Sequence, residues 1–182
     1  MVEILFVIVL MALLLAIGAV VFYSSERNTD LKATAEMVKQ DIRNVYAMAD
    51  SAYVPTGATD SGGIMHKDIY QIKFNLTGDS PPNCYTVLKY SWSGSGYSVV
   101  TTVPTDKLAA NLTTGAQKQY IQPSASSDIQ ITSVTPAGNQ ITFKPSGSII
   151  QTDATGDSTV TIHSKSQNKD IVITVSMFGS VE

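Results

Sequence analysis

Few side chains in this sequence could perform acid–base or nucleophilic chemistry. His66 and His163 are the two histidines, and neither stands beside a nucleophile motif. Each falls in or next to a predicted strand, so we interpret both as surface or hydrogen-bonded histidines. Asp153 and Asp157 lack the alternate-position carboxylates of a calcium loop, which favours a turn over a weak calcium site. We therefore predict no catalytic residue, no metal site and no cofactor.

Cys84 is the single cysteine, so no disulfide can form within the chain. It lies where apolar and polar residues alternate, which favours a small buried side chain over a reactive thiol. A single cysteine leaves the redox compartment open.

Glu3 is the ionisable side chain whose position most needs an explanation. It precedes 20 residues, Ile4 to Tyr23, that contain no charge. A charge at the centre of a membrane helix costs about 2.5–3.5 kcal/mol. A carboxylate at this end of an apolar run therefore needs a partner or access to water.

The distribution of charge divides the chain into three parts. Nine of the thirty residues from Ser24 to Tyr53 are charged, whereas 17 charges are spread over all residues from Val54 onward. We predict an N-terminal helix over residues 1–53, made of an apolar segment (residues 1–23) and an amphipathic segment (residues 24–53). A β-rich head (residues 54–182) follows. The net charge of −3 provides no basic field for nucleic acid.

The apolar segment is long enough to cross a bilayer, which takes about 20 residues. A cleaved signal peptide is the competing interpretation. No Lys or Arg precedes the apolar run, however, and no small-x-small cleavage site closes it. A single-pass membrane anchor remains open, although such an anchor has no use for Glu3.

Apolar residues recur every three or four positions through the amphipathic segment, which predicts one buried helix face. That face contains Leu31, Ala35, Val38, Ile42, Val45, Ala49 and Ala52 or Tyr53, and the opposite face contains Lys32, Glu36, Lys39 and Arg43. We expect the helix to end near Tyr53, because Pro55 disfavours helical backbone in the residue before it. Any bend is expected at residues 28–30, where helix propensity is lowest. A helix about 80 Å long must bury half its length in something other than its own head.

From Lys67 onward the apolar period changes to two, which predicts strands. Seven runs are identified: Tyr70–Leu76, Tyr85–Trp92, Tyr97–Val103, Ile129–Val134, Ile141–Phe143, Thr159–Ser164 and Ile171–Met177. Turn residues separate them, and the first three runs predict two successive hairpins. The expected fold is α+β: a long N-terminal α-helix packed on an antiparallel β-sheet or sandwich head. Leu108–Leu112 is consistent with one or two helical turns.

The opening MVEILFVIV, followed by an amphipathic helix and a sheet, resembles the type IV pilins and pseudopilins. The match starts at the third residue of the mature pilin pattern. The resemblance therefore implies two further residues before Met1, the first with a methylated amino group, and a processing site just upstream. A basic leader ending in Gly would precede that site.

The C-terminal half shows a second likeness. QITFKPSGSIIQTD followed by STVTIHSKSQNKDIVITVSMFGSVE resembles the closing segment of the GspH/FimT-type pilin-like family. In that family a strand ending in Phe-x-Pro-x-Gly leads to two more strands and a terminal turn containing Gly. Phe143, Pro145, Gly147 and Gly179 occupy those places, and residues 104–128 remain unmatched.

The resemblance implies a structural subunit without enzymatic activity that forms a homo-oligomeric helical filament, its apolar segments bundled in the core. Glu3 would lie near the positively charged amino terminus of an adjacent subunit, since a buried carboxylate is tolerated when paired. The implied assembly residues are Glu3, Ile4, Phe6, Ile8, Leu10, Leu14, Ile17 and Gly18. The alternative is that Glu3 snorkels at a membrane surface.

The resemblance also implies partners and location. A precursor in the inner (cytoplasmic) membrane would meet the prepilin peptidase and the pilus assembly machinery, and the finished filament would be extracellular. Family members usually carry Pro near position 20, where this chain has Val20. Gly18 lowers helix stability by about 1 kcal/mol relative to Ala, so any melted stretch is expected at Ile17–Ala19.

Three functional hypotheses follow. The first is a major filament subunit, with adhesion, motility or secretion as properties of the filament. The second is a minor pseudopilin (GspH/FimT-like) of a type II secretion or DNA-uptake filament, and the third is a monomeric membrane-anchored binding domain. Copy number in sheared surface material separates the first two, and detergent-free solubility as fibres separates both from the third.

Two weaker patterns bear on modification and on DNA. Asn75-Leu76-Thr77 and Asn111-Leu112-Thr113 match the N-glycosylation pattern, which is common by chance in a Thr-rich chain. Some FimT-type pilins bind DNA through arginines close to the C-terminus. This chain ends in GSVE and has no Arg after Arg43, so the resemblance does not extend to DNA binding.

Overall fold

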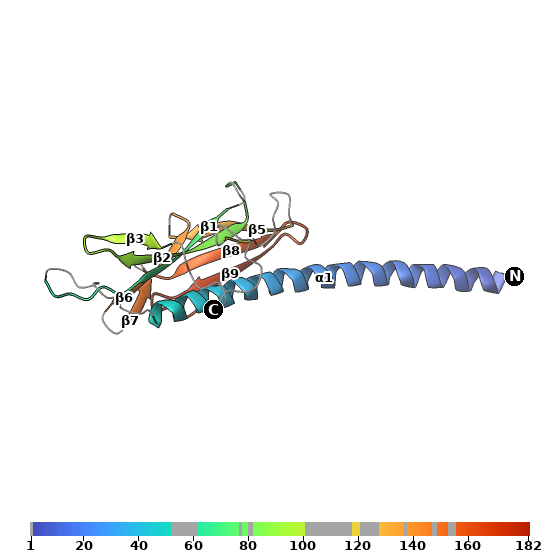
Figure 1. The fold of residues 1–182 in the computed structure, drawn as a ribbon. Coiled ribbons are helices and arrows are strands. Elements are labelled where there is room, and N and C mark those ends of the chain that lie inside the picture. The colour runs from blue at the N-terminus through green and yellow to red at the C-terminus, as the bar shows by residue number, and fades with distance from the viewer. Residues whose placement is uncertain are drawn as a thin grey trace.

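A computed structural model describes residues 2–51, 62–76, 78–79, 82–100, 118–120, 128–136, 138–146, 149–152 and 156–182. One long helix, α1 (Val2–Asp50), leaves a head built of antiparallel strands. In Figure 1 the head packs along one half of α1, and the other half projects from it. The predicted α+β organisation is therefore observed.

Helix α1 runs without interruption through Gly18 and through residues 28–30, where a bend was expected. Figure 1 shows a gentle curve in place of a bend, as is usual for long helices. The helix ends three residues before the predicted Tyr53. Its last turn is closed by the backbone N–H of Ser51, which donates to the carbonyl of Ala47 at 3.0 Å. Tyr53 and Pro55 lie outside the described residues.

A first sheet has the strand order β3-β2-β1-β6-β7, with β4 paired to the other half of β2's outer edge. Its strands are β1 (Ile69–Asn75), β2 (Cys84–Trp92), β3 (Tyr97–Val100), β4 (Lys118–Tyr120), β6 (Gln140–Ser146) and β7 (Ile149–Thr152). Strands β1 and β2 form one antiparallel hairpin and β2 and β3 the next, as predicted. Ser93 closes the second turn through its backbone N–H to the carbonyl of Gly96.

A second sheet has the strand order β5-β8-β9, built from β5 (Ile129–Thr135), β8 (Ser158–Ser164) and β9 (Lys169–Val175). A bulge between Ile131 and Ser133 shifts the register of β5 on β8. Beyond β9, the C-terminal tail (residues 176–182) turns back, and Val181 pairs with Val175. Both sheets pack against α1, so one core joins the amphipathic segment, β1, β2 and β6 with β5, β8 and β9.

All seven predicted strands are present, although the described strands begin or end one to three residues from several predicted limits. Strands β4 and β7 were not predicted, because their sequences, KQY and IIQT, do not alternate apolar and polar residues. In the part of the chain after β6 that the structure describes, three strands follow where the pilin-like resemblance implies two. The expected helical turns at Leu108–Leu112 lie outside the described residues.

The alternation predicted for β1 is only partly reflected in burial. Tyr70, Ile72 and Phe74 are buried, as expected for the inner face. The period of two places Gln71 on the opposite, outer face, but it is also buried. Its amide donates to the hydroxyl of Thr142 on β6, and the hydroxyl of Tyr90 on β2 donates to it. Side chains from the two neighbouring strands thus cover Gln71, and sequence periodicity does not reveal such a contact.

Candidate assembly surface on the N-terminal helix

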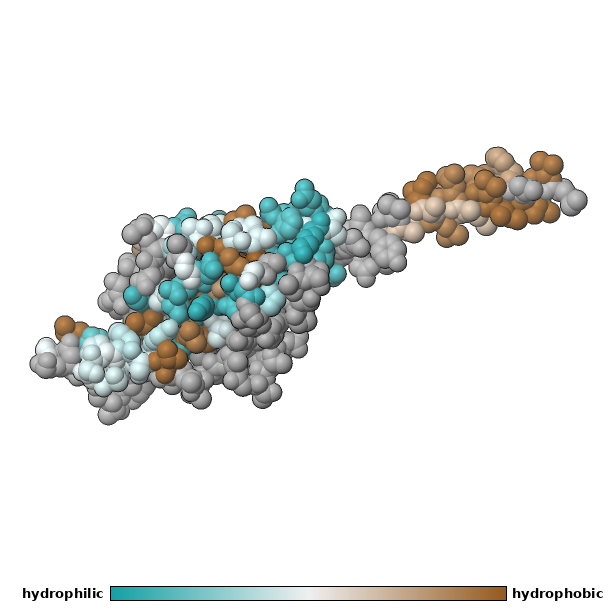
Figure 2. Space-filling model, turned by 90° about the horizontal axis from the view of Figure 1, so that it is seen from above, coloured by the Kyte–Doolittle hydropathy of each residue, from teal (hydrophilic) through white to brown (hydrophobic). Residues whose placement is uncertain are grey.

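The apolar segment is exposed at every position whose side chain the structure describes, residues 2–4 and 6–19. Figure 2 shows it as a brown rod that projects from the head. Its large apolar side chains range from 46% exposed at Leu10 to 84% at Val2. A helix that is apolar on every side belongs in a membrane or in the core of a larger assembly. This segment therefore needs a cover that the head does not supply.

The predicted assembly residues lie on this exposed rod. Ile4, Phe6, Ile8, Leu10, Leu14 and Ile17 are all exposed, and a side-chain carbon added at Gly18 would meet no atom within 4 Å. Their neighbours Val7, Val9, Met11, Leu13 and Leu15 are exposed to a similar degree. Within one subunit, the structure does not distinguish the predicted residues from the rest of the segment.

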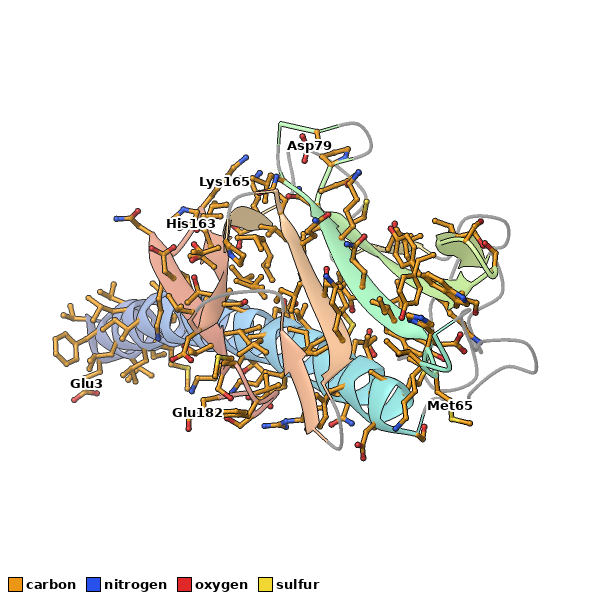
Figure 3. All side chains as sticks on the ribbon, turned by 90° about the vertical axis from the view of Figure 1, so that its left-hand side faces the viewer. Glu3, Met65, Asp79, His163, Lys165 and Glu182 are labelled. Carbon is orange, nitrogen blue, oxygen red and sulfur yellow. The ribbon has the colours of Figure 1, made fainter. Side chains whose placement is uncertain are left out.

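Glu3, labelled in Figure 3, stands in the first turn of α1, and Figure 1 shows this N-terminal end of the helix remote from the head. The side chain is exposed, and no described residue forms an ion pair or hydrogen bond with its carboxylate. A carboxylate in the first helical turn is favoured by the helix dipole, by about 0.3–1 kcal/mol. That gain is small compared with the cost of placing the same charge among apolar side chains without a partner.

The amphipathic segment holds the head through the predicted apolar face. Leu31, Ala35, Val38, Ile42, Val45 and Ala49 are all buried, and Met48 joins them. On the opposite face Glu36 and Lys39 form an ion pair at 3.1 Å. The pattern of three- and four-residue spacings thus predicted correctly which side of α1 the head covers.

Asp41 is the unexpected member of this buried face. Its exposed fraction is 0%, and that of Tyr85 on β2 is 1%. The Tyr85 hydroxyl donates to Oδ2 of Asp41 at 2.5 Å. Burial, with a further contribution from the charge of Asp41, raises the pKa of the Tyr85 phenol far above its usual range. Position 41 belongs to the three- and four-residue series of the apolar face, which is the sequence signal that could have identified it.

The C-terminal tail contacts α1 at Arg43 and Tyr46. The guanidinium of Arg43 donates to the carbonyl of Val181 at 2.8 Å. The tail is held to β9 by a pair of backbone hydrogen bonds between Glu182 and Thr174. Two residues before Val181, Gly179 lies directly against the ring of Tyr46, at a positive φ of 83°. The tail therefore connects the second sheet to the helix.

The histidines and the cysteine that the sequence offered as candidates for chemistry make packing or surface contacts. His66 stacks on Trp92 with ring centroids 3.8 Å apart, and Nδ1 of His163 contacts Oδ1 of Asp170 at 2.7 Å. Cys84 is buried, as predicted. Asp157 is exposed, and Asp153 lies outside the described residues. In the described parts of the chain, no three His, Cys, Asp or Glu side chains come together as a metal site would require.

The two glycosylation patterns have different outcomes. The alternation of β1 places Asn75 on the outward face of the strand, but the residue is half-buried and has an interaction partner. Asn111 lies outside the described residues. At the C-terminus Glu182 is exposed, and Figure 3 shows it on the side of the head next to α1.

No protein-family model, curated protein or solved structure matches this chain. Among the residues that the structure describes, one stretch, Val2–Ala19, is long and apolar enough to span a membrane. None of this stretch is buried against the head. An apolar N-terminal helix that could anchor in a membrane, joined to an antiparallel β head, is therefore what the chain presents.

Proposed function

We infer that this chain is a structural subunit of a type IV pilus-like extracellular filament, assembled through its apolar segment. The observation that carries this proposal is the exposed apolar rod with a single carboxylate, Glu3, at its outer end. Lipid could cover the rod, but lipid offers the carboxylate no opposite charge within the apolar region. A neighbouring subunit offers both an apolar surface and an amino terminus.

The proposal assigns each part of the molecule a role. The apolar segment is the membrane anchor of the precursor in the inner (cytoplasmic) membrane and then the filament core. The head becomes the outer coat of the filament. Adhesion, motility or secretion would be properties of the assembly, and the subunit itself would have no enzymatic activity.

A carboxylate that is buried with its partner is tolerated, whereas one that is buried alone is strongly destabilising. Glu3 therefore selects the alignment of adjacent subunits as much as it stabilises them. The prepilin peptidase and the pilus assembly machinery are the partners that this role requires.

The C-terminal pattern around Phe143 and Pro145, which lies on β6, favours a second candidate of the same class. This is a minor pseudopilin (GspH/FimT-like) of a type II secretion or DNA-uptake filament. Such a subunit is present in few copies, so quantitative mass spectrometry of sheared fibres separates it from a major subunit.

Glu3→Ala tests the proposal directly. The variant should remain inserted in the membrane but yield few filaments in sheared cell-surface material viewed by electron microscopy. Glu36→Ala is the matched control, because Glu36 is an exposed carboxylate on the same helix whose ion pair is worth less than about 1 kcal/mol. Wild-type filament yields from Glu3→Ala would exclude the pairing role. Wild-type fibres that lack this chain would exclude the proposed function itself.

A further inference from the structure

We propose that the Asp41–Tyr85 hydrogen bond sets the axial register of α1 on the head. A carboxylate with an exposed fraction of 0% among Val38, Ile42 and Val45 serves no evident purpose in a face that otherwise needs only apolar residues. Its 2.5 Å bond to the buried hydroxyl of Tyr85 ties one point of the helix to one point of β2. The pair thereby determines how far the apolar segment projects from the head.

The apolar residues alone leave this register ambiguous. The buried face repeats every seven positions, as Leu31, Val38 and Val45 in one series and as Ala35, Ile42 and Ala49 in another. A helix that slides by seven residues presents nearly the same face again, rotated by only about 20°. The displacement along the axis would be about 10 Å, at about 1.5 Å per residue. A slipped helix would still bury apolar side chains.

Asp41 removes that ambiguity, because the residues seven positions before and after it carry no carboxylate. Seven residues before it stands Thr34 and seven after it stands Met48. A slip would carry the carboxylate of Asp41 away from the Tyr85 hydroxyl into apolar surroundings, which is costly for a charge and for the hydroxyl left behind. A single buried polar residue specifies the register of coiled coils in the same way.

Packing is the competing explanation, because side-chain volume also differs along the face. Ile42 is larger than Ala35 and Ala49, and a slip would leave its site underfilled. Arg43 and Tyr46 also contact the C-terminal tail in the observed register. The two explanations predict different behaviour for variants that remove only the polar pair.

The register matters for assembly, and this consequence rests on the proposed function. Subunits of a helical filament are equivalent, so all heads must stand at the same distance from their apolar segments. A slip of about 10 Å in one subunit would misplace its head relative to its neighbours. The pair would then be a positioning element of the filament rather than a source of stability.

The experiment measures a distance within the full chain in detergent micelles. Spin labels are placed at Ala33→Cys on α1 and Val172→Cys on β9, both exposed, while the buried Cys84 is not accessible to the label under native conditions. Pulsed electron resonance then reports the distribution of label separations. The variants are Asp41→Leu/Tyr85→Phe, which replaces the pair by apolar groups, and Ile42→Ala, which changes packing and keeps the pair.

The wild type and Ile42→Ala should each give one population of distances. Asp41→Leu/Tyr85→Phe should add a second population, consistent with an axial displacement of about 10 Å. A single wild-type distance in this folded double variant would overturn the proposal and leave packing as the determinant. If the double variant does not fold, the number of distance populations in Tyr85→Phe decides between the pair and packing. This variant removes only the hydroxyl oxygen and keeps the ring.

Filament yield provides the readout that a purely structural role would not change. The folded double variant should assemble poorly even if its midpoint of thermal unfolding equals that of the wild type. Normal yield together with two distance populations would overturn the consequence for assembly. If the wild type itself forms no filaments, the proposed function fails, while the distances in micelles still test the register.

Discussion

Replacing Gly179 by alanine tests how firmly the C-terminal tail packs on α1. The backbone of Gly179 has φ 83°, a conformation that L side chains rarely adopt. A methyl carbon built there would lie 2.0 Å from Cε2 and 2.2 Å from Cδ2 of Tyr46. That ring meets Phe143 edge-on at 5.9 Å, so it cannot move without disturbing the core. Alanine at position 179 therefore introduces both backbone strain and overpacking.

The two contributions can be estimated separately. The left-handed backbone costs about 1–2 kcal/mol for a residue with a β-carbon. Forcing an additional carbon into a filled site typically costs about 1–3 kcal/mol. The expected loss of unfolding free energy is thus about 2–5 kcal/mol. Gly94→Ala is the matched control, because Gly94 has φ 92° and nothing within 4 Å of an added carbon, so it incurs only the backbone contribution.

The assay is urea unfolding of the full chain in detergent, followed by tryptophan fluorescence from Trp92. Gly179→Ala should lower the unfolding free energy more than Gly94→Ala, by the overpacking contribution of about 1–3 kcal/mol. In a Tyr46→Ala background, where the ring is gone, the two substitutions should cost about the same. Equal losses in the wild-type background would refute the packing of the tail on Tyr46.

Three further predictions concern the head. Burial raises the pKa of the Tyr85 phenol, so the contribution of this group to the unfolding free energy is fully present below pH 10 and is lost as pH rises. The unfolding free energy should fall by about 1.4 kcal/mol per pH unit above 10. Tyr85→Phe should remove that part of the pH dependence, measured as urea midpoints. Lys89→Met should lower the unfolding free energy by about 3–5 kcal/mol, because it leaves the buried Asp68 without its cation at 2.7 Å. Asp68→Asn should cost less, since Lys89 is partly exposed and can reach water; equal losses in thermal unfolding would contradict this reasoning. Asn83→Ala should lower the unfolding free energy by about 2–4 kcal/mol, because Asn83 has φ 50° and its side chain accepts a hydrogen bond from the N–H of Ile131. Hydrogen exchange at the Ile131 amide should accelerate in this variant. Unchanged exchange would contradict the role of that hydrogen bond.

Local patterns predicted most of the secondary structure and the buried face of α1. Alternating apolar residues identified seven strands, because neighbours on a strand point to opposite sides of the sheet. Spacings of three and four identified the face of α1 that carries Leu31, Val38 and Val45. Strands β4 and β7 were missed because Lys118–Tyr120 and Ile149–Thr152 do not alternate apolar and polar residues. Helix α1 ends at Asp50, three residues before the predicted Tyr53.

By itself, the sequence determined that Glu3 precedes an uncharged helical run of about 20 residues, and that a β-rich domain follows the helix. These features depend on residues close together in the chain, so periodicity and composition reveal them. Only the tertiary structure decided that Asp41 meets Tyr85, that Gly179 meets Tyr46, and that Gln71 is covered. Each of these depends on residues far apart in sequence, whose approach is set by strand order and helix docking rather than by any local preference.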